Sequence, residues 1–368
     1  MGSKAENLFE GAFNEDILSQ IATAFDKAVA AGVSEEEALT RLEGAIPQAL
    51  RAATDPLVEA LKSSGHRMVL EHQAERQEFE ARLVSRWLEP LCLYEMFLVA
   101  AREASEEFNQ KEHSEESEQA QWVGAALRLL HGRACLTASE VLYLLRGGYP
   151  FGAQARWRTL HEIAVISAVL SEHPEVAEAY LLHATVASAK DASEYQTRYE
   201  RLGYEALSEE EIKRIEAERS DLIKRFGATY KGAYGWAVSL FENKTDPKFR
   251  DLEELAQLDH LRSHYRWASH HLHAGPRGDV LNLIDRGGQQ VILAGPTNSY
   301  LADPGHGALI SLYQVTVSLL LHGRPGLETE PIRLVILHAL EKLLEEAGEA
   351  FARVQLELDR EEERSGSS

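Results

Sequence analysis

One segment of the sequence, Asp259–Gly275 (DHLRSHYRWASHHLHAG), concentrates side chains that can do chemistry. It holds five histidines, two arginines, two serines and a tyrosine. Imidazoles act as acids, bases or metal ligands, and guanidinium groups bind anions. This segment is therefore the first candidate for a functional site.

A helix over Glu253–Ala274 would sort these side chains by face, at about 100° per residue. The stripe expected to be buried contains Leu261, Tyr265, Ala268 and Leu272. One flank would carry His260, His264 and His271, and the other Arg262, Arg266, Ser269 and His273. Gly275 and Pro276 are expected to end this helix, since glycine favours the left-handed cap and proline cannot continue a helix.

The two flanks suggest different chemistry. Three imidazoles on one face can hold a zinc ion with an open position. However, neither a carboxylate nor a cysteine lies between His260 and His271, so we predict no metal and no cofactor. The arginine-rich flank could grip an anion or supply an acid or base. A purely structural polar network that closes a helix bundle remains the alternative.

A second constellation lies in Arg158-Thr159-Leu160-His161-Glu162. Arg158 and Glu162 are four residues apart, in line with the apolar Val165 and Val169. Because a charge on a buried face must be paired, we expect these two side chains to face each other or the histidine-rich segment. A structural ion pair and a pocket-lining role both remain open.

The apolar periodicity predicts an all-α protein, a multi-helix bundle. The run Ile163–Leu170 is apolar on every face, which is typical of a central, buried helix. Ser208 and Glu211 form a capping box that opens another helix. Alternating residues around Arg286-Gly287-Gly288 predict a small β-hairpin near residues 280–295.

Composition divides the chain into three expected parts. Residues 1–80 form an acidic helical N-terminal region, and residues 81–325 form the helical core domain. Residues 326–368 form a C-terminal helix with a disordered tail.

The net charge of −21 argues against broad binding to nucleic acid or to an anionic membrane. RNA is therefore a disfavoured partner, although the basic segment Trp122–His161 leaves room for a local anion site. Cys92 and Cys135 lie in apolar patterns and are expected to be buried thiols of a reducing compartment. With neither an apolar leader nor a membrane-spanning run in the sequence, we expect a cytoplasmic homo-oligomer, such as a dimer.

The motifs Arg-x₃-Glu (Arg158, Glu162) and Tyr-x₃-Ser-x₃-His-x-Gly (Tyr265, Ser269, His273, Gly275) are similar to those of a known family. Over roughly residues 85–325, the chain resembles a bacterial all-helical family that is catalogued as a domain of unknown function. The resemblance implies a helical fold and a shared Arg/Glu/Ser/His cluster, but no reaction. Some relatives resemble HEPN-type helical domains and occur among prokaryotic defence genes.

Two functions follow as hypotheses. The first is a binding or interaction module whose polar pocket contains Arg158, Glu162, Arg262, Tyr265 and Ser269. The second is a metal-independent, HEPN-like ribonuclease. In it, Arg266 would stabilise phosphate charge, and His271 or His273 would act as general acid or base. The Arg-x₄₋₆-His spacing of Arg266 also arises elsewhere by chance, as in Arg67 with His72, so the spacing alone does not decide.

Overall fold

The computed structural model describes Thr23 and residues 25–27, 29–110, 117–281, 283–286, 289–322 and 331–366. Its contacts divide the chain into two units, Met1–Phe79 and Glu80–Ser368. Most of α2 (Glu35–Arg86) belongs to the first unit. All the candidate site residues belong to the second unit. The last two residues of the predicted disordered tail lie outside the described residues.

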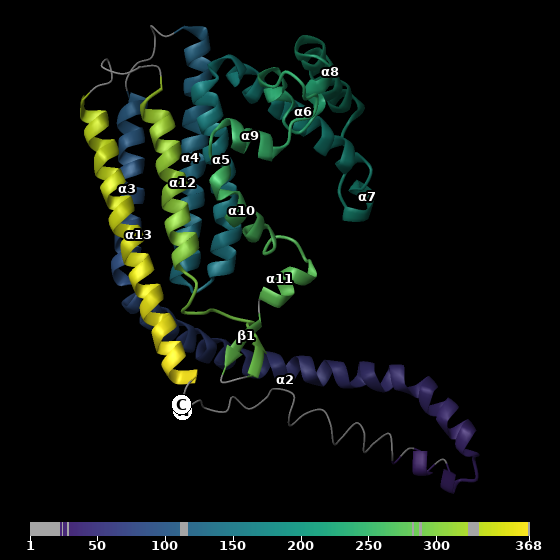
Figure 1. Ribbon diagram of the computed structural model, residues 1–368. Coiled ribbons are helices and arrows are strands. Elements are labelled where there is room, and N and C mark those ends of the chain that lie inside the picture. Colours follow the sequence, from purple (N-terminus) through teal and green to yellow (C-terminus); the bar gives the residue numbers. More distant parts are fainter. Residues whose placement is uncertain are drawn as a thin grey trace. The chain divides into compact units, whose positions relative to one another are not determined.

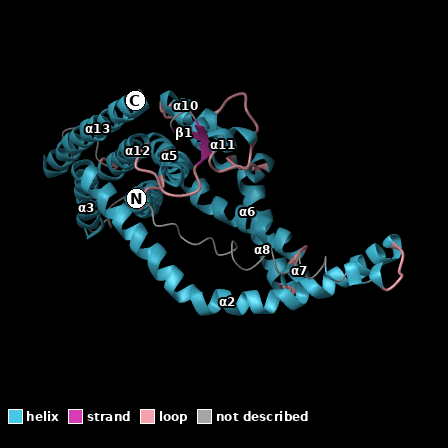
Figure 2. Cartoon of the chain, turned by 90° about the horizontal axis from the view of Figure 1, so that it is seen from below, coloured by secondary structure: helices cyan, strands magenta, loops and turns pink. Residues whose placement is uncertain are grey.

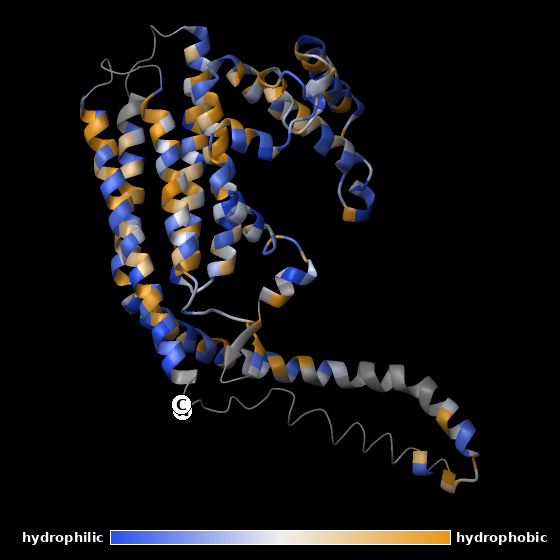
Figure 3. Ribbon diagram, in the orientation of Figure 1, coloured by the Kyte–Doolittle hydropathy of each residue, from blue (hydrophilic) through white to orange (hydrophobic). Residues whose placement is uncertain are grey.

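Long helices of the second unit lie side by side as a bundle (Figure 1). They are α3 (Leu88–Gln110), α4 (Glu118–Arg146), α5 (Pro150–Glu172), α12 (Ala302–Leu320) and α13 (Pro331–Gly366). Hydrophobic and hydrophilic residues alternate along their ribbons, as expected for helices with one face in a core (Figure 3). The predicted all-α bundle is thus confirmed.

The core of the bundle forms where α5 packs against both α4 and α12. Leu127, Leu160 and Leu312 are fully buried there. The apolar run of α5 lies in this core, with Val165, Val169 and Leu170 at 0% exposure. Burial on several faces agrees with the absence of a polar side in that run.

The protonation of one core residue, His131 of α4, should make the stability of the protein depend on pH. It is 2% exposed, and its Nε2 lies 3.1 Å from the hydroxyl of Thr316 on α12. Burial lowers the pKa of His131 from its usual 6.5 to about 4. The unfolded chain therefore takes up a proton below pH 6.5, while the folded protein does not until about pH 4.

We expect the free energy of unfolding to fall by about 1 kcal/mol between pH 7 and pH 5.5 because of His131 alone. The variant His131→Gln keeps a donor near Thr316 and cannot titrate, so its stability should depend less steeply on pH. Urea unfolding of both proteins at the two pH values measures the difference. Equal slopes would show that His131 is not held neutral in the fold.

Shorter elements follow α5. They are a 3₁₀ turn (Pro174–Val176), α6 (Ala177–Gln196), α7 (Tyr199–Leu202), α8 (Glu209–Phe226) and the 3₁₀ turns Ala228–Lys231 and Gly235–Leu240. The predicted capping box at the start of α8 is confirmed, because Ser208 and Glu211 bond each other's backbone. This satisfies amide groups that a helix start leaves free.

The single helix predicted over Glu253–Ala274 is wrong. The chain forms α9 (Phe249–Leu255), a 3₁₀ turn (Asp259–Leu261), α10 (Arg262–Ser269) and α11 (Pro276–Leu281) instead. Gln257 interrupts the segment with a φ of 56°, in the left-handed region that a helix cannot contain.

The chain also turns earlier than predicted, since α10 ends at Ser269 and not at Gly275. A Cβ atom on Gly278 would lie 2.4 Å from the carbonyl oxygen of His270, so the returning backbone needs a glycine there. Leu272, predicted to be buried, is 47% exposed because it follows this turn. Pro276 begins α11, a position where its missing N–H is tolerated.

A small β-hairpin interrupts the helices, as predicted. Its first strand is labelled β1 and drawn in magenta in Figure 2. β1 (Leu283–Arg286) pairs antiparallel with β2 (Gln289–Ile292), in a register that joins Leu283 to Ile292 and Arg286 to Gln289. The two glycines of its turn lie outside the described residues.

The two cysteines differ in their surroundings. Cys135 is buried in the bundle, whereas Cys92 is exposed, so the prediction that both are buried is wrong for Cys92. Its position on α3 faces away from the packed side of that helix. None of the described helices is both long and apolar enough to cross a membrane.

Candidate functional site

Arg158 of α5 joins its helix to α10. Its Nη1 lies 3.0 Å from Oε1 of Glu162, one turn further along α5. Its Nε donates to the hydroxyl of Ser269 at 3.1 Å, and its Nη2 donates to the hydroxyl of Tyr265. The guanidinium carbon also lies 4.4 Å from the centre of the Tyr265 ring. We call these four residues the arginine clamp.

Tyr265 links the two charged residues of the arginine clamp. The tyrosine hydroxyl donates to Oε1 of Glu162 at 2.6 Å. Burial, followed by the nearby carboxylate, raises the pKa of Tyr265, so the phenol stays protonated. The side chains of Arg158 and Glu162 are 24% and 29% exposed, so the ion pair is partly buried and not sealed in the core.

A second network ties α9 to α5. His161 of α5 and Glu253 of α9 are both fully buried, with 3.1 Å between Nε2 and Oε1. The other carboxylate oxygen of Glu253 accepts a hydrogen bond from Arg262 of α10. Glu253 therefore connects three helices. Tyr234 lies close to both networks: burial, then the charge of Glu162, raises its pKa to about 12.

The charged side chains of these two networks are paired with one another, which limits their capacity to bind a further ligand. Arg158 and Glu162 balance each other's charge, and so do Glu253 and Arg262. Each carboxylate is already within bonding distance of a donor from a neighbouring helix. The main consequence of the geometry is that α9 and α10 are fixed against α5.

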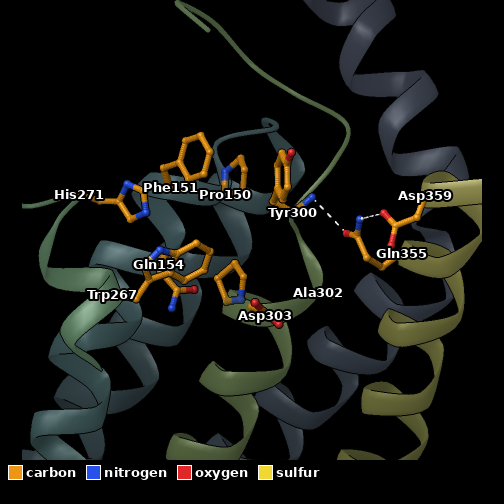
Figure 4. Close-up of a pocket in the computed structure, with 11 residues that line it drawn as sticks. Pro150, Phe151, Gln154, Trp267, His271, Tyr300, Ala302, Asp303, Gln355 and Asp359 are labelled. Atoms are coloured by element: carbon orange, nitrogen blue, oxygen red, sulfur yellow. Dashed lines mark hydrogen bonds between the residues drawn. The ribbon is translucent and has the colours of Figure 1, made fainter. Parts of the chain in front are cut away.

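The start of α5 and the segment around the end of α10 also border a hollow of about 240 Å³ (Figure 4). Its floor and walls include Phe151 and Gln154 of α5, Trp267 of α10, His271, and Tyr300 just before α12. The first turn of α12 adds Asp303, and α13 adds Gln355 and Asp359. We call this space the aromatic hollow.

Stacked rings form one side of the aromatic hollow. The Phe151 and His271 rings are stacked with centroids 4.7 Å apart. Trp267 meets His271 edge-on at 5.9 Å, and Tyr300 stacks on Phe151 at 5.9 Å. Burial lowers the pKa of His271, with a contribution from His270, so this ring is neutral near pH 7.

Two buried polar atoms in this wall have no hydrogen-bond partner within the described part of the chain. They are Oε1 of Gln154, a residue that is 4% exposed, and Nε2 of His271. Buried polar atoms in folded proteins are nearly always paired with protein, water or a ligand. Both residues line the hollow, so a molecule inside it can supply the partners.

The opposite side of the hollow is held by Gln355. Its side-chain oxygen accepts a hydrogen bond from the backbone N–H of Tyr300 at 3.1 Å, and its Nε2 donates to Asp359 at 2.9 Å (Figure 4). Tyr300 has a φ of 72°, a strained backbone conformation for a residue other than glycine. Gln355 thus holds Tyr300 in this strained conformation at the rim of the hollow. Strained backbone conformations often occur beside ligand sites.

A second hollow of about 240 Å³ adjoins the first and shares Gln154, Ala302 and Asp303 with it. His264 and His306 also line it. Burial lowers the pKa of His306, and the nearby Asp303 opposes this shift. Among the described residues, no three or more His, Cys, Asp or Glu side chains are grouped to hold a metal ion.

The residues selected from the sequence fall into three groups. Arg158, Glu162, Tyr265 and Ser269 meet in the arginine clamp, and Arg262 joins Glu253 nearby. His271 lies in the wall of the aromatic hollow. Arg266 and His273 are exposed and line neither hollow.

Sequence reasoning missed Glu253, Gln154 and most of the aromatic hollow. His161 offered a signal, because a histidine on an all-buried helix needs a polar partner. The partner's identity depends on where α9 folds back. The hollow had no local signal, since its walls come from four separate segments.

Comparison with known proteins finds a match to a family whose function is unknown. Residues 124–290 match a Family of unknown function (DUF5677). The match covers less than half of the chain, and it contains α5, α9 and α10 but neither α12 nor α13. No curated protein and no solved structure matches the chain.

Proposed function

We propose that the second unit is a binding module that holds a small organic molecule in the aromatic hollow. The observation that carries this proposal is the pair of buried, unpartnered atoms, Gln154 Oε1 and His271 Nε2, in a ring-lined cavity. Ligand sites are typically apolar hollows with a few fixed polar groups. The arginine clamp then has a positioning role, because it fixes the helix that carries Trp267.

RNA cleavage by Arg266, His271 and His273 has less support. Arg266 and His273 are exposed, and the hollow beside His271 carries two carboxylates. The basic segment that favoured RNA is also partly neutralised, since Arg146, Arg156 and Arg158 are each paired with a glutamate. A link to HEPN-type domains or to defence remains a hypothesis from resemblance.

Self-association remains a prediction as well. It is supported by exposed apolar residues spaced by seven along α4, namely Leu129, Leu136 and Tyr143, with Tyr143 81% exposed. A cytoplasmic location also remains a prediction.

The binding proposal is tested by filling the hollow. Ala302 lines both hollows, so Ala302→Phe should block them. A diverse fragment library, screened by ligand-observed NMR, should give hits with the wild type that this variant loses. The matched control is Ala217→Phe, at an exposed alanine of α8, which should keep the hits.

Melting curves of both variants must first show that the fold is intact. If Ala302→Phe does not fold, the smaller change Ala302→Leu replaces it. The proposal is wrong if folded wild-type protein gives no fragment hit that is sensitive to position 302.

A further inference from the structure

The charges around the aromatic hollow indicate which molecules it can accept. Asp303 and Asp359 lie at its exposed rim, and none of the described lining residues is a lysine or arginine. The adjoining hollow, which shares Asp303, likewise has neither among its described lining residues. A carboxylate or phosphate ligand would meet only like charge here, whereas a cation would be attracted.

The rings favour the same class of molecule. The π faces of tryptophan, tyrosine and phenylalanine attract a cation within about 6 Å of the ring centre, and cages of such rings recognise organic ammonium ions. Trp267, Phe151 and Tyr300 supply such faces here. Because Phe151 and Trp267 are partly buried, the attraction to these two rings is less weakened by water than at an open surface.

The unpartnered atoms add a requirement for hydrogen-bond donors. The amide oxygen of Gln154 is an acceptor, and the neutral imidazole of His271 has one acceptor nitrogen. A ligand that satisfies the Gln154 oxygen must donate a hydrogen bond, so N–H groups suit the site better than the methyl groups of a quaternary ammonium.

We propose that the aromatic hollow binds an organic ammonium ion that carries N–H donors and an apolar or aromatic body. The ammonium group contacts the Gln154 acceptor and the rings, with Asp303 supplying the countercharge. The body of the ligand packs against the wall formed by Phe151, Trp267 and Tyr300. This inference rests on the proposed binding function and specifies the class of ligand.

Three molecules of similar size and different charge test the inference. They are 2-phenylethylamine, 2-phenylethanol and phenylacetate, titrated against the full-length protein at pH 7.5 by calorimetry or NMR. The amine should bind at least about tenfold more tightly than the alcohol, and phenylacetate should bind least. Added salt should weaken the binding of the amine and leave the binding of the alcohol unchanged.

Substitutions then locate the interaction. Asp303→Asn keeps the shape of the side chain. It should weaken the binding of the amine about five- to tenfold without affecting the binding of the alcohol. Asp191→Asn, at an exposed aspartate of α6 that lines neither hollow, is the matched control and should change nothing. Gln154→Met should also weaken the binding of the amine. Choline, which has no N–H donor, should bind to the wild type more weakly than the amine.

The outcomes separate this inference from the binding proposal. Equal affinity for the amine and the alcohol, with both lost in Ala302→Phe, would overturn the ammonium assignment and leave the hollow as a binding site. Choline binding as tightly as the amine would overturn the requirement for N–H donors. Amine binding that is insensitive to both Asp303→Asn and Ala302→Phe would place the cation elsewhere and refute the inference.

Discussion

Replacing Glu253 with alanine is expected to lower the free energy of unfolding by about 3–5 kcal/mol. The carboxylate is fully buried and accepts from both His161 and Arg262. Its removal leaves the buried His161 ring without its polar partner and opens a cavity between α5 and α9. The loss of one member of a buried, charged network costs far more than the loss of an exposed ion pair.

The next residue provides the matched control. Glu254 pairs with Arg250, but both side chains are largely exposed, at 45% and 68%. Glu254→Ala should therefore change stability by less than about 1 kcal/mol. Urea unfolding at pH 7 compares the two variants with the wild type. Similar small losses for both glutamates would show that Glu253 does not hold these helices together.

Arg158→Ala is expected to have the second largest effect, a loss of about 2–4 kcal/mol. The change removes the hydrogen bonds to Tyr265 and Ser269 and the ion pair with Glu162. Glu162 is 29% exposed, so water relieves part of the penalty that a sealed carboxylate would carry. The expected loss is accordingly smaller than for Glu253.

Hydrogen exchange tests the position of this effect as well as its size. Amides of α10 should exchange faster in Arg158→Ala, because the clamp no longer ties that helix to α5. Arg353→Ala, which breaks the exposed pair with Glu89, serves as the control and should leave α10 unchanged. An unchanged melting temperature and unchanged exchange in Arg158→Ala would rule out a clamping role.

The arginine clamp and the aromatic hollow are linked through α10. Tyr265 and Ser269 of this helix bond to Arg158, and Trp267 of the same helix lines the hollow. Loss of the clamp should therefore loosen one wall of the hollow without altering its chemistry. Residues far from a ligand affect binding in this way when they position the element that contacts it.

Local patterns in the sequence were sufficient for most helices. The apolar run Ile163–Leu170 predicted a buried helix, and the Ser208–Glu211 pair predicted a helix start. These features depend on residues within one or two turns of each other, so they can be recognised without the rest of the fold. The spacing of Arg158 and Glu162 likewise placed both on one face of a helix.

The path of the histidine-rich segment depended on the tertiary structure. Its polar and apolar residues fit a continuous helix, but contacts of α9 and α10 with α5 favour a break at Gln257. Glu253 then turns toward His161, and the segment after Ser269 folds back beneath His270. Helical propensity is worth only tenths of a kcal/mol per residue, so such long-range packing overrides it.

What the sequence by itself determined was the class of fold and the residues able to pair as a clamp. Only the tertiary structure decided that the aromatic hollow exists, since Gln154, Trp267, Tyr300 and Asp359 come from distant parts of the chain. Periodicity reports which face of a helix is buried, because that depends on neighbours along the chain. It does not report which faces of different helices leave a space between them, because that depends on how the whole unit packs.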